Sequence, residues 1–281
     1  MKIGVITDCF KKPLSEAVTM AGKLGFDGVQ IYATTGEFSP DTLTAERKSE
    51  IKEQLLQTGL EISALCGDMG GYGYQIESDN PERIEKTKAI IDLAVEFGTK
   101  VITTHIGVIP ADHNHPRYKT MLNALNACGA YAMERGVTLA IETGPESAKT
   151  LKMFLDDTCG GVGVNLDPAN FVMVTGQDPV EAVKILGDYI VHTHVKDGIM
   201  LKRTDPQIIY DHFAEGGIEA LNIADYFLET PLGEGAVDFP AYITALRNIG
   251  FDGYLTIERE TGADPIADII TAKKMVEDII N

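Results

Sequence analysis

The sequence has no tryptophan, few cysteines and a shortage of positive charge. Its 281 residues include 24 Lys and Arg against 42 Asp and Glu, which gives a formal net charge of -18. Nucleic-acid affinity depends on clustered Lys and Arg, so this balance argues against an extended phosphate-binding surface. We therefore expect no nucleic-acid partner, and we take the acidity as a contribution to solubility.

The cysteines are far apart in the sequence and include no CxxC pair: Cys9, Cys66, Cys128 and Cys159. This spacing excludes zinc-knuckle and dithiol redox motifs, and a disulfide framework is not expected in a chain of this size. No apolar run reaches the ~18 residues that would cross a bilayer. The opening segment MKIGVITDCF has the pattern of a first strand and not of a signal peptide. We expect a cytoplasmic protein without a membrane partner.

One pattern recurs along the whole chain: an amphipathic helix, a glycine and a short apolar strand. Glycine commonly follows a helix end, where the backbone turns left-handed. Seven such joins follow an opening strand from Lys2 to Thr7, so the pattern predicts eight strands. The joining glycines are Gly25, Gly59, Gly98, Gly136, Gly161, Gly187 and Gly250.

Helices are expected between these strands at 14–24, 41–58, 82–97, 117–135, 147–157, 178–186, 238–249 and 264–280. Strands that alternate with helices favour parallel pairing with right-handed crossovers. Eight such units favour a closed (β/α)8 TIM barrel over an open doubly wound sheet. No GxGxxG follows the first strand, which argues against dinucleotide binding. No linker interrupts the chain, so we predict an α/β fold with one domain over residues 1–281.

One connection is much longer than the others: the segment at about 197–236, after the seventh strand. Insertions after barrel strands lie at the catalytic end of the barrel. Long connections in compact domains are usually functional or disordered. The segment contains Phe213, Tyr226 and Phe227, so we predict an ordered lid.

The last four strands each end in an ionisable side chain that alternation turns to the barrel axis. In VTLAIETG, the apolar Leu139 and Ile141 are expected to face the helices, which turns Glu142 inward. The next three strands, VGVNLD, IVHTHVKD and YLTIERE, follow the same alternation and bring in Asp167, His194 and Glu258.

Three converging carboxylates would repel one another strongly in a cavity of low dielectric constant. A divalent cation would neutralise them with ordinary oxygen and nitrogen ligands. We therefore predict one metal ion at these four strand ends. Imidazole with three carboxylates suits Mn²⁺ first, with Mg²⁺ and Co²⁺ as alternatives.

The strand ends IETG, LDPAN, HVKD and IERE, with LGEGAVDFPAY before the last unit, resemble the xylose isomerase-like TIM barrels over essentially the whole chain. That family includes sugar phosphate isomerases, ketose 3-epimerases, inosose dehydratases and endonuclease IV. The resemblance implies that Glu142, Asp167, His194 and Glu258 hold the metal and that the two glutamates are the acid/base pair. Two positions depart from the family pattern: Gln30 replaces a frequent glutamate, and Asn170 replaces the histidine of epimerases.

Five further side chains are candidates for substrate binding: His105, Asn170, Lys196, Tyr72 and Arg259. For each there is a structural alternative, such as a core histidine at His105 or an ion pair at Lys196. Tyr72 belongs to the glycine-rich loop GDMGGYGY, whose glycines can equally serve turns. His192 is expected to be structural. His113 and His115, in DHNHP, are expected to be solvated loop residues.

Together these residues predict a metal-dependent sugar isomerase or epimerase that moves a proton through an enediolate, with the ion as Lewis acid. A lyase or dehydratase acting on a keto-sugar or inosose is open on the same scaffold. An endonuclease IV-type repair enzyme is disfavoured by six histidines and the acidic charge. A non-catalytic sugar-binding barrel would not need two facing glutamates. The substrate's identity and phosphorylation and the oligomeric state, a homo-oligomer included, stay open.

Overall fold

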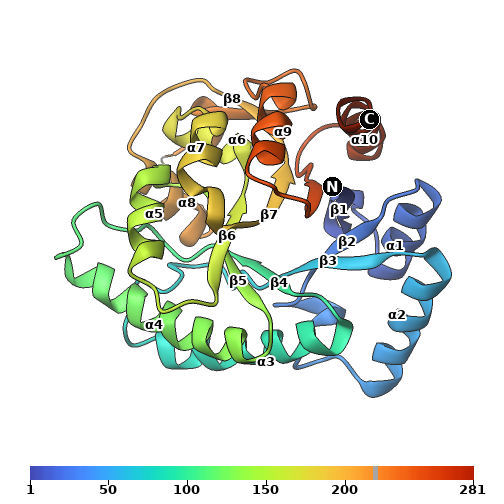
Figure 1. The fold of residues 1–281 in the computed structure, drawn as a ribbon, viewed down its shortest axis with the longest axis horizontal. Coiled ribbons are helices and arrows are strands. Elements are labelled where there is room, and N and C mark those ends of the chain that lie inside the picture. The colour runs from blue at the N-terminus through green and yellow to red at the C-terminus, as the bar shows by residue number, and fades with distance from the viewer. Residues whose placement is uncertain (218–220) are drawn as a thin grey trace.

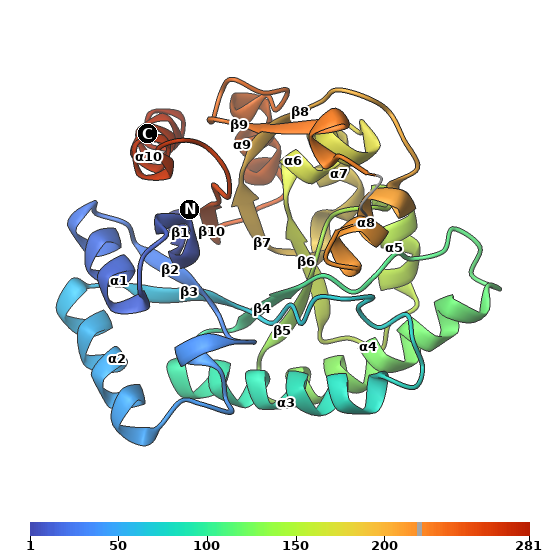
Figure 2. The ribbon, with the colours of Figure 1, turned by 180° about the vertical axis from the view of Figure 1, so that it is seen from behind.

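The fold is a closed barrel of parallel strands surrounded by helices (Figures 1 and 2). The computed structural model describes residues 1–217 and 221–281. The barrel order is β1-β10-β7-β6-β5-β4-β3-β2, and each neighbouring pair is parallel. The strands are β1 (Lys2–Ile6), β2 (Gly28–Tyr32), β3 (Glu61–Cys66), β4 (Val101–Thr104), β5 (Thr138–Glu142), β6 (Val162–Leu166), β7 (Ile190–Val195) and β10 (Tyr254–Ile257). The predicted single-domain (β/α)8 barrel is confirmed.

The helices of the outer layer match the expected ranges closely. They are α1 (Leu14–Lys23), α2 (Ala45–Thr58), α3 (Asn80–Phe97), α4 (Pro116–Glu134), α5 (Ala148–Asp156), α7 (Pro179–Leu186), α9 (Phe239–Asn248) and α10 (Pro265–Ile280). Side-chain caps fix several starts: Ser147 accepts a hydrogen bond from Thr150 N, and Asp178 accepts one from Val180 N. Such caps satisfy amides that have no partner inside the helix. None of the described helices is long and apolar enough to span a membrane.

Two local expectations are wrong. The helix predicted from 41 begins at Ala45, because Thr44 caps it through Arg47 N and a short 3-10 turn, η2 (Gly36–Phe38), occupies part of the preceding connection. Gly187 does not adopt the left-handed conformation expected after a helix, since its φ is 0° and a second 3-10 turn, η4 (Gly187–Tyr189), continues from α7. The other six joining glycines have positive φ.

The long segment after β7 carries secondary structure of its own. It contains β8 (Asp197–Met200), α8 (Pro206–Ala214), the 3-10 turn η5 (Ile223–Asp225) and β9 (Phe227–Thr230), with β8 and β9 paired as an antiparallel ribbon outside the barrel. The buried Asp197 carboxylate ties the ribbon to the next loop, because it accepts hydrogen bonds from the amides of Gly198, Gly233, Gly235 and Val237. A Cβ at Gly235 would lie 2.1 Å from Asp197 Oδ1, so only glycine fits there.

The segment after β7 contacts the opposite side of the barrel, at the loop that precedes α3 and at the start of α4. Tyr210 of α8 donates to Gly71 O in the β3–α3 loop, and Arg117 at the start of α4 donates to Gln207 of α8. Figure 2 shows α8 on the same side of the barrel as α5. A second unpredicted element, α6 (Pro168–Asn170) with the π-helical turn η3 (Phe171–Thr175), follows β6 directly. Helix α8 and the α6–η3 segment therefore lie at the C-terminal end of the barrel.

Candidate metal centre

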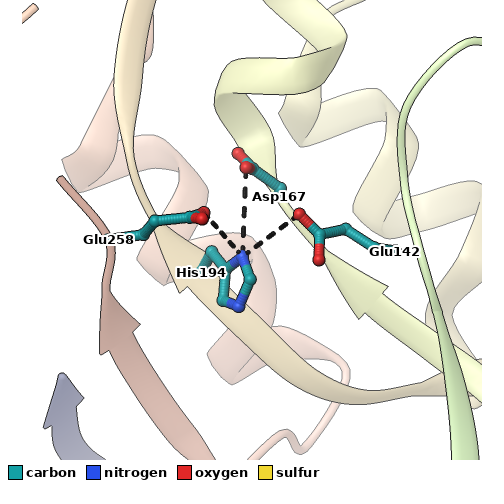
Figure 3. A group of neighbouring side chains, drawn as sticks. All are labelled: Glu142, Asp167, His194 and Glu258. Atoms are coloured by element: carbon teal, nitrogen blue, oxygen red, sulfur yellow. Dashed lines mark ion pairs between the residues drawn. The ribbon is translucent and has the colours of Figure 1, made fainter. Parts of the chain in front are cut away.

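Four side chains from adjacent strand ends meet at the C-terminal end of the barrel (Figure 3). Glu142 is the last residue of β5, and His194 is in β7. Asp167 directly follows β6, and Glu258 directly follows β10. One ligand atom from each residue lies within 4.8 Å of those from the other three. The structure thus brings together the four residues that the strand pattern predicted as metal ligands.

The imidazole lies at the centre of the group, with carboxylates on three sides (Figure 3). His194 Nδ1 is 2.9 Å from Glu258 Oε2, 3.5 Å from Glu142 Oε1 and 3.9 Å from Asp167 Oδ2. All four residues are buried, and Asp167 is completely inaccessible. Glu258 Oε2 is ion-paired with His194 and Lys196, whereas Asp167 Oδ2 has no hydrogen-bond partner in the described part of the chain. A buried carboxylate oxygen such as Asp167 Oδ2 requires a positive group or a donor.

The electrostatics of the group follow from this packing. Burial alone raises the pKa of Glu142, but His194 and His105 more than offset it and hold the pKa well below its usual value. Burial lowers the pKa of His194, and Glu258 and Glu142 raise it well above its usual value. Without an ion, the His194 imidazolium is the positive charge nearest all three carboxylates, and Lys196 and His105 lie beside two of them. A divalent ion would have to displace that proton before Nδ1 could coordinate.

The donor set fits a divalent cation. Three carboxylates and one imidazole are ligands that Mn²⁺, Mg²⁺ and Co²⁺ accept, and the set has no thiolate to favour a softer metal. Asp167 Oδ2, buried and without a hydrogen bond among the described residues, points to the same requirement. The group is therefore a candidate metal site.

Two asparagines hold the glutamate and aspartate ligands in place. Asn165 Nδ2 donates to Glu142 Oε2 at 3.2 Å. Asn170 Nδ2 is 3.5 Å from Glu142 Oε1 and 2.9 Å from Thr143 O, and its backbone amide donates to Asp167 Oδ1. Asp167 Oδ1 also caps α6 through Ala169 N. Asn170, predicted as a substrate contact, thus lies beside both ligands.

His105 approaches the same group from the end of β4. Its Nε2 is 3.8 Å from Glu142 Oε1, and its Nδ1 is 2.9 Å from Asp68 Oδ2. Burial lowers the pKa of His105, but Glu142 and the hydrogen bond with Asp68 raise it to about 10. His105 is therefore a cation beside Glu142. Tyr72, in contrast, reaches the lid segment, where its hydroxyl donates to Glu215.

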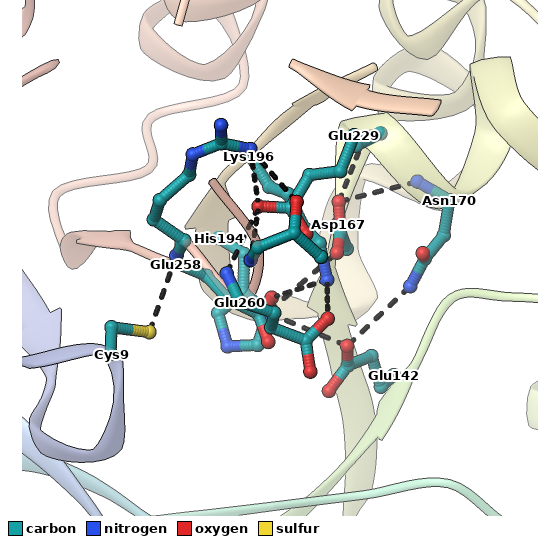
Figure 4. Close-up of polar contacts among 12 residues, drawn as sticks. Cys9, Glu142, Asp167, Asn170, His194, Lys196, Glu229, Glu258 and Glu260 are labelled. Atoms are coloured by element: carbon teal, nitrogen blue, oxygen red, sulfur yellow. Dashed lines mark hydrogen bonds and ion pairs between the residues drawn. The ribbon is translucent and has the colours of Figure 1, made fainter. Parts of the chain in front are cut away.

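Lys196 lies beside Glu258 and Glu260 (Figure 4), and Arg259 follows Glu258 in the chain. Lys196 Nζ is 3.4 Å from Glu258 Oε2 and pairs more closely with Glu260. Arg259 is buried and bound on two sides, by Glu229 of β9 and Asp268 of α10. The Arg259 guanidinium therefore joins the lid ribbon to the last helix. The substrate roles predicted for Lys196 and Arg259 remain predictions.

His192 lies in the barrel interior, and His113 and His115 lie in an exposed loop, at the places that the sequence predicted. His192 is buried one layer below His194, and His113 and His115 are exposed in the loop before α4. Burial lowers the pKa of His192 to about 3, so this residue is neutral.

Two buried or half-buried acids near the site were missed from the sequence. Asp68 follows β3 closely and orients His105, and its place just after a strand was the available signal. Glu146 follows β5 by four residues and is only 6% exposed, and its Oε2 has no partner among the described residues. Burial raises the pKa of Glu146 to about 8, although His105 partly opposes that shift. No local pattern distinguishes Glu146 from a surface loop glutamate.

Comparisons with known proteins agree with this architecture. A family model described as "Xylose isomerase-like TIM barrel" matches residues 18–278. An inosose dehydratase of Clostridium perfringens is 24% identical over 60% of this chain and 57% of its own length. A crystal structure of a xylose isomerase domain protein from Planctomyces limnophilus is 25% identical, with a TM-score of 0.79 over 99% of this chain and 96% of that one. A D-tagatose 3-epimerase-like protein aligns with a TM-score of 0.76 at 18% identity, over 100% and 97% of the two chains.

The chain belongs to the xylose isomerase-like TIM barrel family. Its relatives by name include an inosose dehydratase, and its structural neighbours include an epimerase-like protein.

Proposed function

We propose that this protein is a metal-dependent sugar isomerase or epimerase. The observation that carries the proposal is the buried convergence of Glu142, Asp167, His194 and Glu258, whose ligand atoms lie within 4.8 Å of one another. Family membership supports it, because relatives are named as an inosose dehydratase and a 3-dehydro-D-guloside 4-epimerase. A divalent ion held by the four residues, Mn²⁺ by preference, would supply Lewis-acid polarisation of a carbonyl and its neighbouring hydroxyl.

The two glutamates are suited to move the proton. Figure 3 shows Glu142 and Glu258 on opposite sides of His194, so they face the space above the imidazole from two directions. One carboxylate, ionised at the start, removes the proton from the carbon next to the carbonyl. The other starts protonated and returns its proton from its own side, and both regain their starting states by proton exchange with water. Return to the opposite face of that carbon gives an epimer. Such a transfer by a positioned group contributes about 10²–10⁴ in rate.

Other side chains orient the substrate in this proposal. Lys196 and His105 are cations on either side of the centre and would donate hydrogen bonds to substrate oxygens. Asn170 holds Glu142. The lid segment at 197–236, with Tyr72 as its contact in the β3–α3 loop, would exclude water. Arg259 fixes the base of that lid to α10.

A dehydratase is the second candidate. It is favoured by the C. perfringens inosose dehydratase among the relatives and by the place of His105, whose Nε2 lies 3.8 Å from Glu142 Oε1. A protonated donor at that place would assist the departure of a hydroxyl group, whereas an epimerase needs only the two carboxylates. An endonuclease IV-type activity is not supported, because the candidate cluster in the described residues includes one histidine.

Incorporation of deuterium from D₂O into a substrate panel tests the proposal. The purified protein with Mn²⁺ is incubated with ketoses, their phosphates and inososes, and each compound is followed by NMR and mass spectrometry. We expect one exchangeable carbon position that gains deuterium only when metal is present and chelator is absent. Recovery of an epimer identifies an epimerase, and loss of water identifies a dehydratase. No exchange or product with any compound would contradict the proposal.

A further inference from the structure

A buried glutamine lies directly below the candidate metal centre. Gln30, in β2, is 1% exposed and is on the far side of the barrel from β5 and β6 in the strand order. The pairing of β2 with β3 shifts register between Val29 and Gln30. Irregularities of this kind re-aim a side chain and are common beside active sites. Here the side chain extends across the barrel interior to β7.

The amide of Gln30 lies with its nitrogen toward Thr103 and its oxygen toward β7. Its Nε2 donates to Thr103 Oγ1 at 3.2 Å, so its Oε1 is turned toward the two histidines of β7. That oxygen is 3.0 Å from His192 Nε2 and 3.2 Å from His194 Nε2. A carbonyl oxygen only accepts hydrogen bonds, so with the amide in this orientation both Nε2 atoms carry a hydrogen.

The hydrogen on Nε2 decides what Nδ1 of His194 can do. A neutral imidazole with its hydrogen on Nε2 has its lone pair on Nδ1, the nitrogen that lies 2.9 Å from Glu258 Oε2. Asn165 Nδ2 also lies 3.2 Å from Nε2. Two donors cannot bond each other, so that amide hydrogen goes to Glu142 Oε2, also at 3.2 Å.

We propose that Gln30 is a positioning residue of the metal centre: its side-chain oxygen holds His194 in the tautomer and ring orientation that presents Nδ1 to the ion. Partners of this kind fix a ligand histidine and typically change metal affinity by about 10–100-fold when removed. As an uncharged acceptor, Gln30 does so without adding a fourth buried carboxylate to the centre. The inference rests on the metal site of the proposed function.

Metal affinity of matched variants tests the proposal. Gln30→Met removes the acceptor at similar volume, and Gln30→Glu keeps an acceptor oxygen. Thr256→Val is the control, because Thr256 Oγ1 contacts His192 Nε2 at 3.0 Å in the same buried layer and has no hydrogen bond with His194. Mn²⁺ binding to each folded variant is measured by EPR of the free ion, with circular dichroism as the check of folding.

We expect Gln30→Met to bind Mn²⁺ about 10–100-fold more weakly than the wild type and more weakly than Gln30→Glu. Thr256→Val should stay within about twofold of the wild type. Equal affinities of wild type and Gln30→Met would overturn this inference alone. Failure of the wild type to bind Mn²⁺ would overturn the proposed function together with it.

A second measurement does not depend on the folding of a Gln30 variant. The wild type, labelled with ¹⁵N-histidine and loaded with diamagnetic Mg²⁺, is studied by long-range ¹H–¹⁵N NMR, with His194→Gln used to assign the signal. The proposal requires a hydrogen on Nε2 of His194 and none on Nδ1. A hydrogen on Nδ1 would overturn it.

Discussion

The Tyr72 hydroxyl donates a hydrogen bond to Glu215 Oε1, joining the β3–α3 loop to the residue that follows α8. Tyr210 reinforces the link by donating to Gly71 O. These contacts bridge two loops that are far apart in the sequence. These bonds, together with that from Arg117 to Gln207, must break for α8 to move away from the barrel end.

The lid contact predicts a local effect of Tyr72→Phe. Loss of the hydroxyl should speed amide hydrogen exchange in α8 by a few fold while the barrel strands stay protected. A substrate analogue should slow exchange in the same helix. Tyr131→Phe is the control, because Tyr131 bonds Asp92 at the surface, away from the lid. Unchanged exchange of α8 in both experiments would remove the lid interpretation of residues 197–236.

Replacement of Asp197 by alanine is expected to lower the free energy of unfolding strongly. Its carboxylate accepts from backbone amides on both sides of the lid ribbon, and Asp197→Ala leaves several of them buried without partners. We expect a loss of about 2–4 kcal/mol in the free energy of unfolding, measured by urea denaturation. Asp205→Ala, which removes only an exposed cap of α8, should cost about 0.5–2 kcal/mol. Equal losses in the two variants would contradict the anchoring role.

Replacement of Glu146 by glutamine is expected to stabilise the fold at high pH but not at low pH. Burial raises the folded pKa of Glu146 to about 8, above the 4.5 of an ordinary glutamate. As the pH rises, Glu146 loses its proton in the unfolded state before it does so in the folded state. Below pH 4.5 the carboxyl is protonated in both states and its burial does not reduce the free energy of unfolding. That free energy then falls as the pH rises from 4.5 through about 8. Glu146→Gln stays neutral and should raise the melting temperature at pH 8.5 by about 2–4 °C per kcal/mol recovered, with little change at pH 5. The same gain in Glu134→Gln, an exposed site, would show that only net charge matters.

Replacement of Asp167 by alanine is expected to remove the bound metal ion. Asp167→Ala removes a fully buried ligand, and we expect Mn²⁺ affinity to fall by more than about 100-fold. Elemental analysis after dialysis should find about one ion per wild-type chain and almost none in the variant. Asp112→Ala, in an exposed loop, is the control. Equal metal in wild type and Asp167→Ala would eliminate the site.

Much of the site was predictable because it follows from local alternation. An apolar Leu139 and Ile141 on one face of β5 place Glu142 on the other, and the same rule placed His194 and Glu258. The helix ranges followed from periodicity and caps. Those signals lie within a few residues of the position that they predict.

The rest depended on contacts between distant segments. Gln30 reaches His194 across 164 positions, and Arg259 is bound by Glu229 and Asp268 from elements outside its strand. The burial of Glu146 comes from neighbours that the sequence around it does not specify. Helix α8 could not be located because the segment had no sustained periodicity, although its aromatic residues indicated order.

The central claim is that Glu142 and Glu258 transfer the proton in addition to holding the ion. Each is replaced by glutamine, which keeps the size and a coordinating oxygen, and Mn²⁺ content and deuterium exchange of the substrate are measured on the same sample. We expect both variants to retain metal while exchange at the carbon beside the carbonyl falls by about 10²–10⁴ for the residue acting as base. If both variants keep the metal and exchange at near wild-type rate, the two-glutamate account is wrong and the base must be sought at His105 or Lys196.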